Sequence, residues 1–207
     1  MSDPPRPSSG RLLLDPPWDA WSPYEIRSRL SAVEVPWCVA AGWALDMFRG
    51  EVTRAHEDIE IAVPSRTFPV ICQALSELDF VVVGAGQSWP LDSPAYDVMH
   101  QTWGRDRSTG LYRLDVLREP HVGATWIYRR DPRIRRPYST VIRRSVEGIP
   151  FMTPEIVLLF KAKHMREKDQ QDFVATLPLL GASARAWLVN ALQRIHPRHP
   201  WLAELST

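Results

Sequence analysis

Two segments of the chain alternate between side chains of different polarity, as a strand with two unlike faces does. Residues 58–63 read Asp-Ile-Glu-Ile-Ala-Val and place acidic side chains on one side and aliphatic side chains on the other. Residues 111–117 show the same alternation around Asp115. Further strands are predicted for residues 37–40, 80–83 and 96–103. These patterns predict a sheet in which the aliphatic side of residues 58–63 faces the core.

Helical spacing and capping residues predict helices on both sides of this run of strands. Ser22 suits an N-cap and Pro23 the first helical position, so a helix is predicted over residues 22–33. Thr153 and Pro154 repeat this opening and predict a helix to about residue 165. Further helices are predicted over residues 43–48, 65–78, 169–180 and 182–195. The order of elements indicates an α+β domain with helices packed on one mixed sheet.

The length of 207 residues suits one domain with a small helical appendage. Residues 1–10 are rich in Pro, Ser and Gly and are predicted to form a disordered tail. Residues 11–150 are predicted to form the main domain. Residues 151–207 are predicted to form a C-terminal helical segment packed on it.

The composition is that of a globular protein and excludes a mostly disordered or fibrous chain. Hydrophobic residues make up 44% and charged residues 24%, which are ordinary values for a globular protein. Because the chain has 25 Lys and Arg and 24 Asp and Glu, its net charge does not favour electrostatic binding to nucleic acid or membrane through the whole surface. Cys38 and Cys72 lie in apolar stretches and are interpreted as buried, reduced thiols. With neither a secretory leader nor a membrane span apparent, a cytoplasmic location is expected.

The strongest chemical signal is the pair Asp58 and Glu60. On a strand, residues two apart point to the same side, so these carboxylates stand roughly 6–7 Å apart along it. Two neighbouring carboxylates repel each other and resist burial, so a cation is expected between them. Hard oxygen ligands on a rigid element suit Mg²⁺. The alternative is an exposed strand face that happens to carry two acids.

The segment before these acids favours the metal interpretation. Residues 39–43 predict a strand, a tight turn and a helix start, with Gly42 placed 16 residues before Asp58. The free N–H groups of a helix start suit a phosphate, and a phosphate beside metal-binding carboxylates is what nucleotidyl transfer needs. Asp115 offers a third carboxylate from another strand. Its alternative role is an ion-pair partner for Arg113 or Arg118.

Taken together, these residues resemble a known family. Residues 41–46, Ala-Gly-Trp-Ala-Leu-Asp, followed by residues 54–61, Arg-Ala-His-Glu-Asp-Ile-Glu-Ile, resemble the aminoglycoside 2″-nucleotidyltransferase group of the DNA polymerase β-like nucleotidyltransferase superfamily. The family pattern is a Gly-Gly-Trp-Ala turn followed by His-x-Asp-Ile and an acid on the next strand. A looser match runs through residues 113–115 and from Pro154 to Asp172. The resemblance spans roughly residues 37–175.

This resemblance implies a polymerase β-like nucleotidyltransferase fold, with residues 11–150 as the nucleotidyltransferase domain. It implies Mg²⁺-dependent transfer of a nucleoside monophosphate from an NTP, with ATP as the first choice, to a hydroxyl group, and release of pyrophosphate. Two Mg²⁺ ions are expected. The residues expected to act as catalytic groups and metal ligands are Asp58, Glu60 and Asp115, with Asp115 as a candidate base. The residues expected to contact the nucleotide are Gly42, Trp43, Arg54 and Lys161.

One position departs from the family pattern. The family turn has two glycines, and this chain has Ala41 at the first of them. If that position requires a positive φ, alanine costs about 1 kcal/mol or more in strain. If it requires only a small side chain near the phosphate, alanine is acceptable. The departure therefore keeps open a catalytically weak, NTP-binding pseudoenzyme.

The acceptor is less clear than the reaction. Residues 129–144 hold seven arginines against one acid, Asp131, whereas a polycationic aminoglycoside prefers an acidic pocket. This Arg129–Arg144 segment suits a triphosphate, an RNA backbone or simply solvent. The leading hypothesis is nucleotidylation of a small, antibiotic-like molecule by a monomer or homodimer. The alternatives are a toxin-type transferase acting on tRNA or protein, and an NTP-binding module without turnover.

Overall fold

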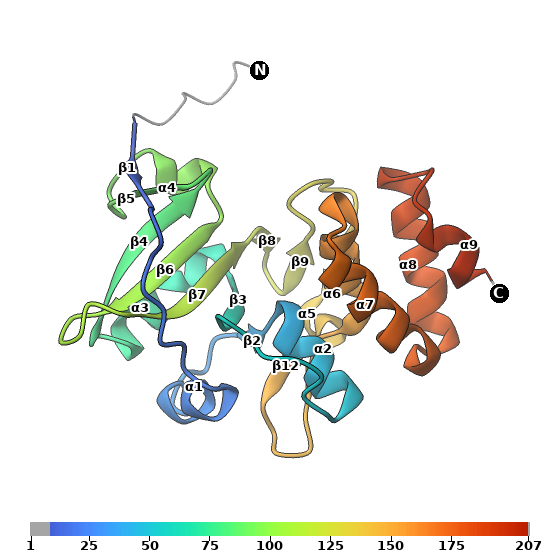
Figure 1. Ribbon diagram of the computed structural model, residues 1–207, viewed down its shortest axis with the longest axis horizontal. Coiled ribbons are helices and arrows are strands. Elements are labelled where there is room, and N and C mark those ends of the chain that lie inside the picture. Colours follow the sequence, from blue (N-terminus) through green and yellow to red (C-terminus); the bar gives the residue numbers. More distant parts are fainter. Residues whose placement is uncertain (1–8, 207) are drawn as a thin grey trace. The chain divides into compact units, whose positions relative to one another are not determined.

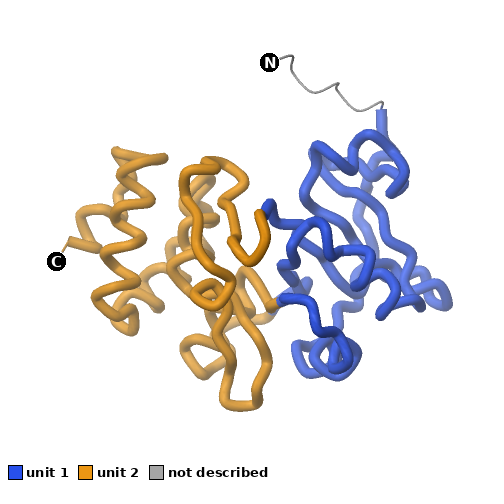
Figure 2. Tube along the Cα trace, turned by 180° about the vertical axis from the view of Figure 1, so that it is seen from behind, with its two compact units in different colours: residues 1–37, 56–121 blue, residues 38–55, 122–207 orange. Residues whose placement is uncertain are grey.

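The computed structural model describes residues 9–206, and the chain divides into two compact units (Figures 1 and 2). Unit 1 contains the residues up to Trp37 together with His56–His121, and unit 2 contains Cys38–Ala55 together with the residues from Val122 onward. The division predicted at residue 150 remains a prediction. Most of the predicted N-terminal tail, residues 1–8, lies outside the described residues.

Unit 1 is built on strands in the order β1-β5-β4-β6-β7-β3 (Figure 1). The β3–β7 pair is parallel, and the other neighbouring pairs in this series are antiparallel. The strand bounds are β1 Arg11–Leu12, β3 Glu60–Pro64, β4 Leu78–Gly84, β5 Gln87–Trp89, β6 Gln101–Asp106 and β7 Tyr112–Glu119. Mixed strands with flanking helices make this an α+β protein, as predicted.

The core of unit 1 follows from the aliphatic positions of β3 and β7. The side chains of Ile59, Ile61 and Val63 are buried, as their alternation predicts, and so are Leu114 and Val116. Both faces of this parallel pair are covered, as is usual for parallel strands. A polar side chain held between such residues is therefore largely removed from solvent.

Unit 1 also carries short helices, α1 Pro23–Arg29, α3 Phe68–Ala74 and α4 Ala95–Val98, and a 3₁₀ turn, η1 Ser65–Thr67. The predicted start of the first helix is confirmed, because Ser22 and Glu25 form a capping box with Pro23 in the first turn. The strand predicted over residues 96–103 is wrong in its first half. The Ser93 hydroxyl accepts a hydrogen bond from the N–H of Ala95 and favours the helix α4, so the strand begins only at Gln101.

Unit 2 combines short strands with most of the helices (Figure 1). β12 pairs in parallel with β2 and antiparallel with β11, and β9 pairs antiparallel with β10. The strand bounds are β2 Cys38–Val39, β9 Thr125–Ile127, β10 Arg135–Pro137, β11 Ile142–Arg144 and β12 Pro150–Met152. β8, His121–Val122, lies where the chain passes from unit 1 into unit 2.

The helices of unit 2 pack mainly through α6, which contacts α2, α7 and α8. Ile156, Leu158 and Leu159 of α6 are fully buried, as are Leu188 and Leu192 of α8. The helix bounds are α2 Ala41–Arg49, α5 Tyr138–Val141, α6 Pro154–Lys161, α7 Glu167–Thr176, α8 Ala182–Ile195 and α9 Trp201–Leu205, with 3₁₀ turns η2 Ala162–His164 and η3 Leu177–Leu179. Of the helices among residues 9–206, none has the length and apolar character needed to cross a membrane.

Two details at helix starts differ from prediction. Thr153 occupies the N-cap position of α6, but its side chain makes no capping hydrogen bond. The helix predicted to begin at residue 43 begins at Ala41, with Ala40 at the N-cap position. The predicted helix over residues 182–195 agrees with α8 at both ends.

Candidate metal centre

Three carboxylates predicted from the sequence lie together in unit 1. Asp58, Glu60 and Asp115 each offer one carboxylate oxygen, and these oxygens all lie within 4.8 Å of one another. Three negative charges at this spacing repel one another strongly. The group therefore has the composition and spacing that a hard divalent cation requires.

The register of two strands explains how the acids meet. In the parallel β3–β7 pair, Glu60 lies beside Asp115. The backbone N–H of Asp115 donates to the carbonyl oxygen of Ile59 at 2.9 Å, which fixes the segment just before β3. Asp58 lies in this segment, because β3 begins at Glu60 and not at residue 58 as predicted. Glu60 and Asp115 are thus placed by strand pairing, and Asp58 by the segment that leads into it.

The acids differ in exposure. Asp115 is only 1% exposed, whereas Asp58 and Glu60 are half-buried. A carboxylate buried this deeply is costly unless charged or polar groups compensate it. Asp115 is therefore the rigid, desolvated member of the cluster, and the other two acids border solvent.

A neighbour of Asp115 was missed in the sequence. Gln101, at the start of β6, donates a hydrogen bond from its side-chain amide to Oδ2 of Asp115. β6 pairs antiparallel with β7, and this pairing places Gln101 close to the acid. No signal in the sequence identifies it, because an isolated glutamine becomes informative only when the register of β6 against β7 is known.

Arg113 and Arg118, the alternative ion-pair partners of Asp115, each contact other groups of unit 1. Arg113 pairs with Asp19 and Asp106. The Arg118 guanidinium lies 3.7 Å from the ring centroid of Tyr96 and donates to the carbonyl oxygens of Tyr96 and Met99. Both arginines are engaged elsewhere in unit 1.

The predicted phosphate-binding turn belongs to unit 2. Ala41 has φ +49°, in the left-handed region that glycine adopts more easily. Gly42 is buried and Trp43 is half-buried in the first turn of α2. Ala41 thus adopts the conformation for which the family glycine is suited. The nucleotide contacts expected of Gly42 and Trp43 remain predictions.

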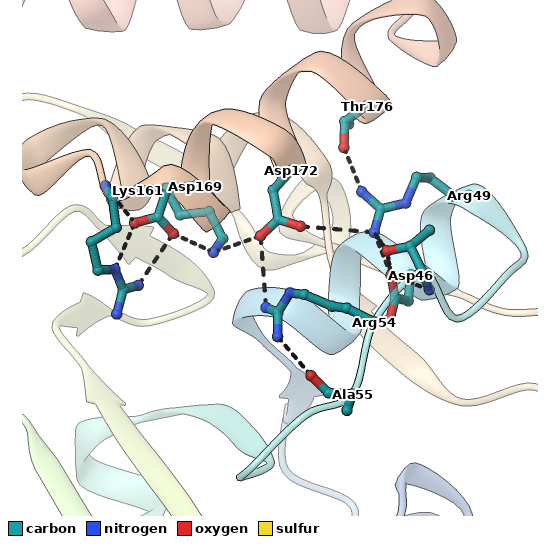
Figure 3. A network of polar contacts seen from close by, with 10 residues as sticks. Asp46, Arg49, Arg54, Ala55, Lys161, Asp169, Asp172 and Thr176 are labelled. Atoms are coloured by element: carbon teal, nitrogen blue, oxygen red, sulfur yellow. Dashed lines mark hydrogen bonds and ion pairs between the residues drawn. The ribbon is translucent and has the colours of Figure 1, made fainter.

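Lys161 and Arg54 belong to a polar network within unit 2 (Figure 3). The Nζ of Lys161 lies 2.7 Å from Oδ1 of Asp169 and 2.9 Å from Oδ2 of Asp172, and its side chain is 8% exposed. Arg54 Nη2 lies 3.7 Å from Oδ2 of Asp172. Burial raises the pKa of Asp169, but hydrogen bonds from Arg166 and Lys161 outweigh this and hold it at about 2. Contact of Lys161 or Arg54 with a nucleotide remains a prediction.

The arginine-rich segment of residues 129–144 is largely occupied by internal contacts. Arg136 pairs with Glu155, and Arg133 pairs with Asp131. Arg130 donates to the carbonyl oxygen of Phe160, and Arg143 lies over the ring of Phe48. These arginines tie β10, β11 and their loops to the rest of unit 2, which is a structural role.

The fold is similar to that of antibiotic nucleotidyltransferases of known structure, which have the polymerase β-like fold. The crystal structure of the lincosamide antibiotic adenylyltransferase LnuA, lincomycin-bound, aligns with a TM-score of 0.53 and 16% identity over 76% of this chain and 95% of that chain. The crystal structure of ANT(2″)-Ia in complex with adenylyl-2″-tobramycin aligns with a TM-score of 0.56 and 16% identity over 83% of this chain and 95% of that one. The predicted fold class is confirmed.

Residues 24–91, about a third of the chain, match the family model for aminoglycoside-2″-adenylyltransferase. The matched segment contains the turn at Ala41 and Gly42 and the acids Asp58 and Glu60, and it ends before Asp115. The resemblance predicted from these motifs is confirmed over residues 24–91. A comparison with curated proteins gives no match.

Proposed function

We propose that this protein transfers a nucleoside monophosphate from an NTP, ATP foremost, to a hydroxyl group of a small antibiotic-like acceptor, with release of pyrophosphate. The observation that carries the proposal is the convergence of Asp58, Glu60 and Asp115 within 4.8 Å. The family match of residues 24–91 supports a nucleotide co-substrate. Family and fold alone would be equally compatible with a protein that has lost its metal site.

The residues present fit a divalent ion, because they supply oxygen ligands from a rigid strand pair and leave two acids at the solvent border. When bound, Mg²⁺ would neutralise charge on the phosphates and on the departing pyrophosphate. Asp58 and Glu60 would hold the metal from the solvent side, and Asp115 would hold it from the buried side. The β3–β7 pairing would keep Glu60 and Asp115 in place before substrate arrives, and the segment that leads into β3 would hold Asp58.

Asp115 is also the candidate for accepting the proton of the acceptor hydroxyl. In the transfer step, the acceptor oxygen forms a bond to the α-phosphorus while the bond from that phosphorus to the pyrophosphate oxygen breaks. The hydroxyl proton passes to a base, for which Asp115 is our choice. The hydrogen bond from Gln101 holds the Asp115 carboxylate in a fixed orientation.

A small-molecule acceptor is favoured over RNA. The arginines of residues 129–144, the segment expected to bind an RNA backbone, mostly contact acids, carbonyl oxygens and aromatic rings of unit 2. Of the similar structures, LnuA is lincomycin-bound and ANT(2″)-Ia is in complex with adenylyl-2″-tobramycin. A lincosamide and an aminoglycoside are therefore the first acceptors to test.

The experiment supplies ATP labelled in its α-phosphate, Mg²⁺, and either tobramycin, lincomycin or total tRNA. We expect labelled product and pyrophosphate with an antibiotic, and no label on tRNA. Asp58→Asn and Glu60→Gln should each lower the rate by at least about 100-fold, because they remove metal-binding charge. Glu57→Gln, which alters an exposed acid beside Asp58 but outside the cluster, should retain the wild-type rate.

Three results would contradict the proposal. Full activity in both Asp58→Asn and Glu60→Gln would show that the cluster is not the reaction centre. Transfer to tRNA with none to the antibiotics would replace the proposed acceptor by RNA. Absence of pyrophosphate with every acceptor, although ATP binds, would identify an NTP-binding module without turnover.

A further inference from the structure

A cavity lies wholly within unit 2 and has no part in the proposed reaction. Its volume is about 410 Å³, which lies within the range of small-molecule sites. The cavity is lined by residues of α2, β10, α5, β11 and η3 and by the first halves of α6 and α8. Its polar lining includes Arg136, Arg143, Thr153 and Glu155, and its largest apolar side chains are Phe48 and Trp187.

The first sign of a ligand is the hydroxyl group of Thr153. Thr153 is 5% exposed, and among the residues that the structure describes its Oγ1 has no hydrogen-bond partner. Thr153 stands at the N-cap position of α6, where a threonine hydroxyl normally accepts from the first turn of the helix, yet it makes no such bond. Because Thr153 lines the cavity and a buried hydroxyl without a partner is unfavourable, a polar group inside the cavity would satisfy it.

The charges around the cavity define what that group can be. Arg136 pairs with Glu155, so these two side chains neutralise each other. Arg143 is exposed and lies over the ring of Phe48. The Cζ atom of its guanidinium is 5.5 Å from the ring centroid. Arg143 therefore leaves an excess of one positive charge among the ionisable side chains that line the cavity. A ligand with a single negative charge balances it.

The aromatic side chains define the body of the ligand. Trp187 is half-buried, and the Arg136 guanidinium lies 5.1 Å from its ring centroid, which holds the indole in place. Aromatic groups favour offset or edge-on contact with such rings. A flat apolar body beside Trp187 or Phe48, with one anionic group toward Arg143 and Thr153, satisfies every feature of the lining.

We propose that this cavity is a binding site for a small aromatic carboxylate, separate from the metal centre of unit 1. The carboxylate accepts a hydrogen bond from the Thr153 hydroxyl and interacts with Arg143, and the ring contacts the aromatic side chains. No covalent step is involved. The proposal does not depend on the nucleotidyltransferase reaction, because every residue it uses belongs to unit 2 and none is part of the carboxylate cluster.

The test is titration of the full chain with benzoate, followed by NMR of the tryptophan indole N–H groups. Trp187→Phe assigns the resonance of Trp187. We expect that resonance to shift on titration, and expect benzyl alcohol, which has the ring without the charge, to bind at least about 10-fold more weakly. Thr153→Val keeps the shape but removes the hydroxyl, and should weaken benzoate binding about 5- to 10-fold.

A neighbouring pair of arginines supplies the matched control. Arg143 and Arg144 are both exposed on β11, but only Arg143 lines the cavity. Arg143→Gln should weaken benzoate binding about 10-fold, and Arg144→Gln should leave it unchanged. The proposal is overturned if benzoate does not shift the Trp187 resonance, if Arg143→Gln and Arg144→Gln bind equally well, or if benzyl alcohol binds as tightly as benzoate.

Discussion

Ala41, like Ala85, is an alanine whose backbone adopts a conformation that favours glycine. Its φ of +49° places a Cβ in the left-handed region, which costs an alanine roughly 1 kcal/mol. We therefore expect Ala41→Gly to raise the free energy of unfolding by up to about 1 kcal/mol, because relief of strain exceeds the entropy that glycine adds to the unfolded chain. Urea unfolding of the two proteins measures the difference.

Ala186→Gly is the matched control for this change. Ala186 is exposed in the interior of α8, where glycine should cost about 0.5–1 kcal/mol. Opposite signs for the two alanine-to-glycine changes would support strain at Ala41. Equal losses at both positions would show that the turn carries no such strain.

Gln101 allows the role of Asp115 to be tested without removing the acid itself. In Gln101→Leu the carboxylate loses its hydrogen bond from the side-chain amide and becomes less well oriented. We expect kcat to fall about 10-fold and the half-saturating Mg²⁺ concentration to rise, since residues that support metal ligands affect both by such amounts. A normal Mg²⁺ dependence with unchanged kcat would show that Gln101 only packs against β7.

The polar network between α2, α6 and α7 shows how elements are joined by buried charge (Figure 3). Lys161 serves both Asp169 and Asp172, which are 1% and 4% exposed as side chains. Lys161→Met leaves two buried carboxylates with reduced compensation, and should lower the free energy of unfolding by about 3 kcal/mol. Arg166 also pairs with Asp169, but its own side chain is 63% exposed. Arg166→Met should therefore lower the free energy of unfolding by at most about 1 kcal/mol. Chemical unfolding compares them, and equal losses would contradict the distinction.

The same network predicts a dependence of stability on pH. Because the pKa of Asp169 in the folded protein is lowered from 3.8 to about 2, its ionised form stabilises the fold fully above about pH 4. That contribution disappears as the pH falls through about 2. We expect Asp169→Asn to be less stable than the wild type at pH 5, and the gap between them to narrow between about pH 4 and pH 2 in urea unfolding. A gap that stays constant over this range would contradict the prediction.

For individual helices and strands, a prediction from the sequence was correct where the hydrophobic pattern and the capping residues indicated the same element. The helix α8, Ala182–Ile195, was predicted at both ends because a long periodic segment carries its own information. The strand predicted over residues 96–103 was wrong because Ser93 and Pro94 start a helical turn that the hydrophobic pattern does not show. The missing cap at Thr153 could not be predicted either, since it depends on which groups surround the hydroxyl.

Across the whole chain, motif chemistry could be predicted better than contacts between distant segments. The pair Asp58 and Glu60 and the candidate Asp115 were identified from patterns within single strands. Their meeting depends on the parallel register of β3 and β7, which pairs Glu60 with Asp115. Gln101 and the division into two units depend on long-range pairing that a single sequence does not display.

The clustering of three acids predicts that the stability of the protein responds to divalent ions. Without a cation their repulsion destabilises the fold, and an ion that binds only the folded state stabilises it by RT ln(1 + [L]/Kd). With 10 mM Mg²⁺ and a Kd of roughly 1 mM, this gives about 1.4 kcal/mol and a rise in Tm of about 3–6 °C over the protein in EDTA. The variant with Asp58→Asn, Glu60→Gln and Asp115→Asn should melt at the same temperature in both conditions. If the variant still gained stability from Mg²⁺, the ion would be binding elsewhere, and the assignment of these three residues as its ligands would fail.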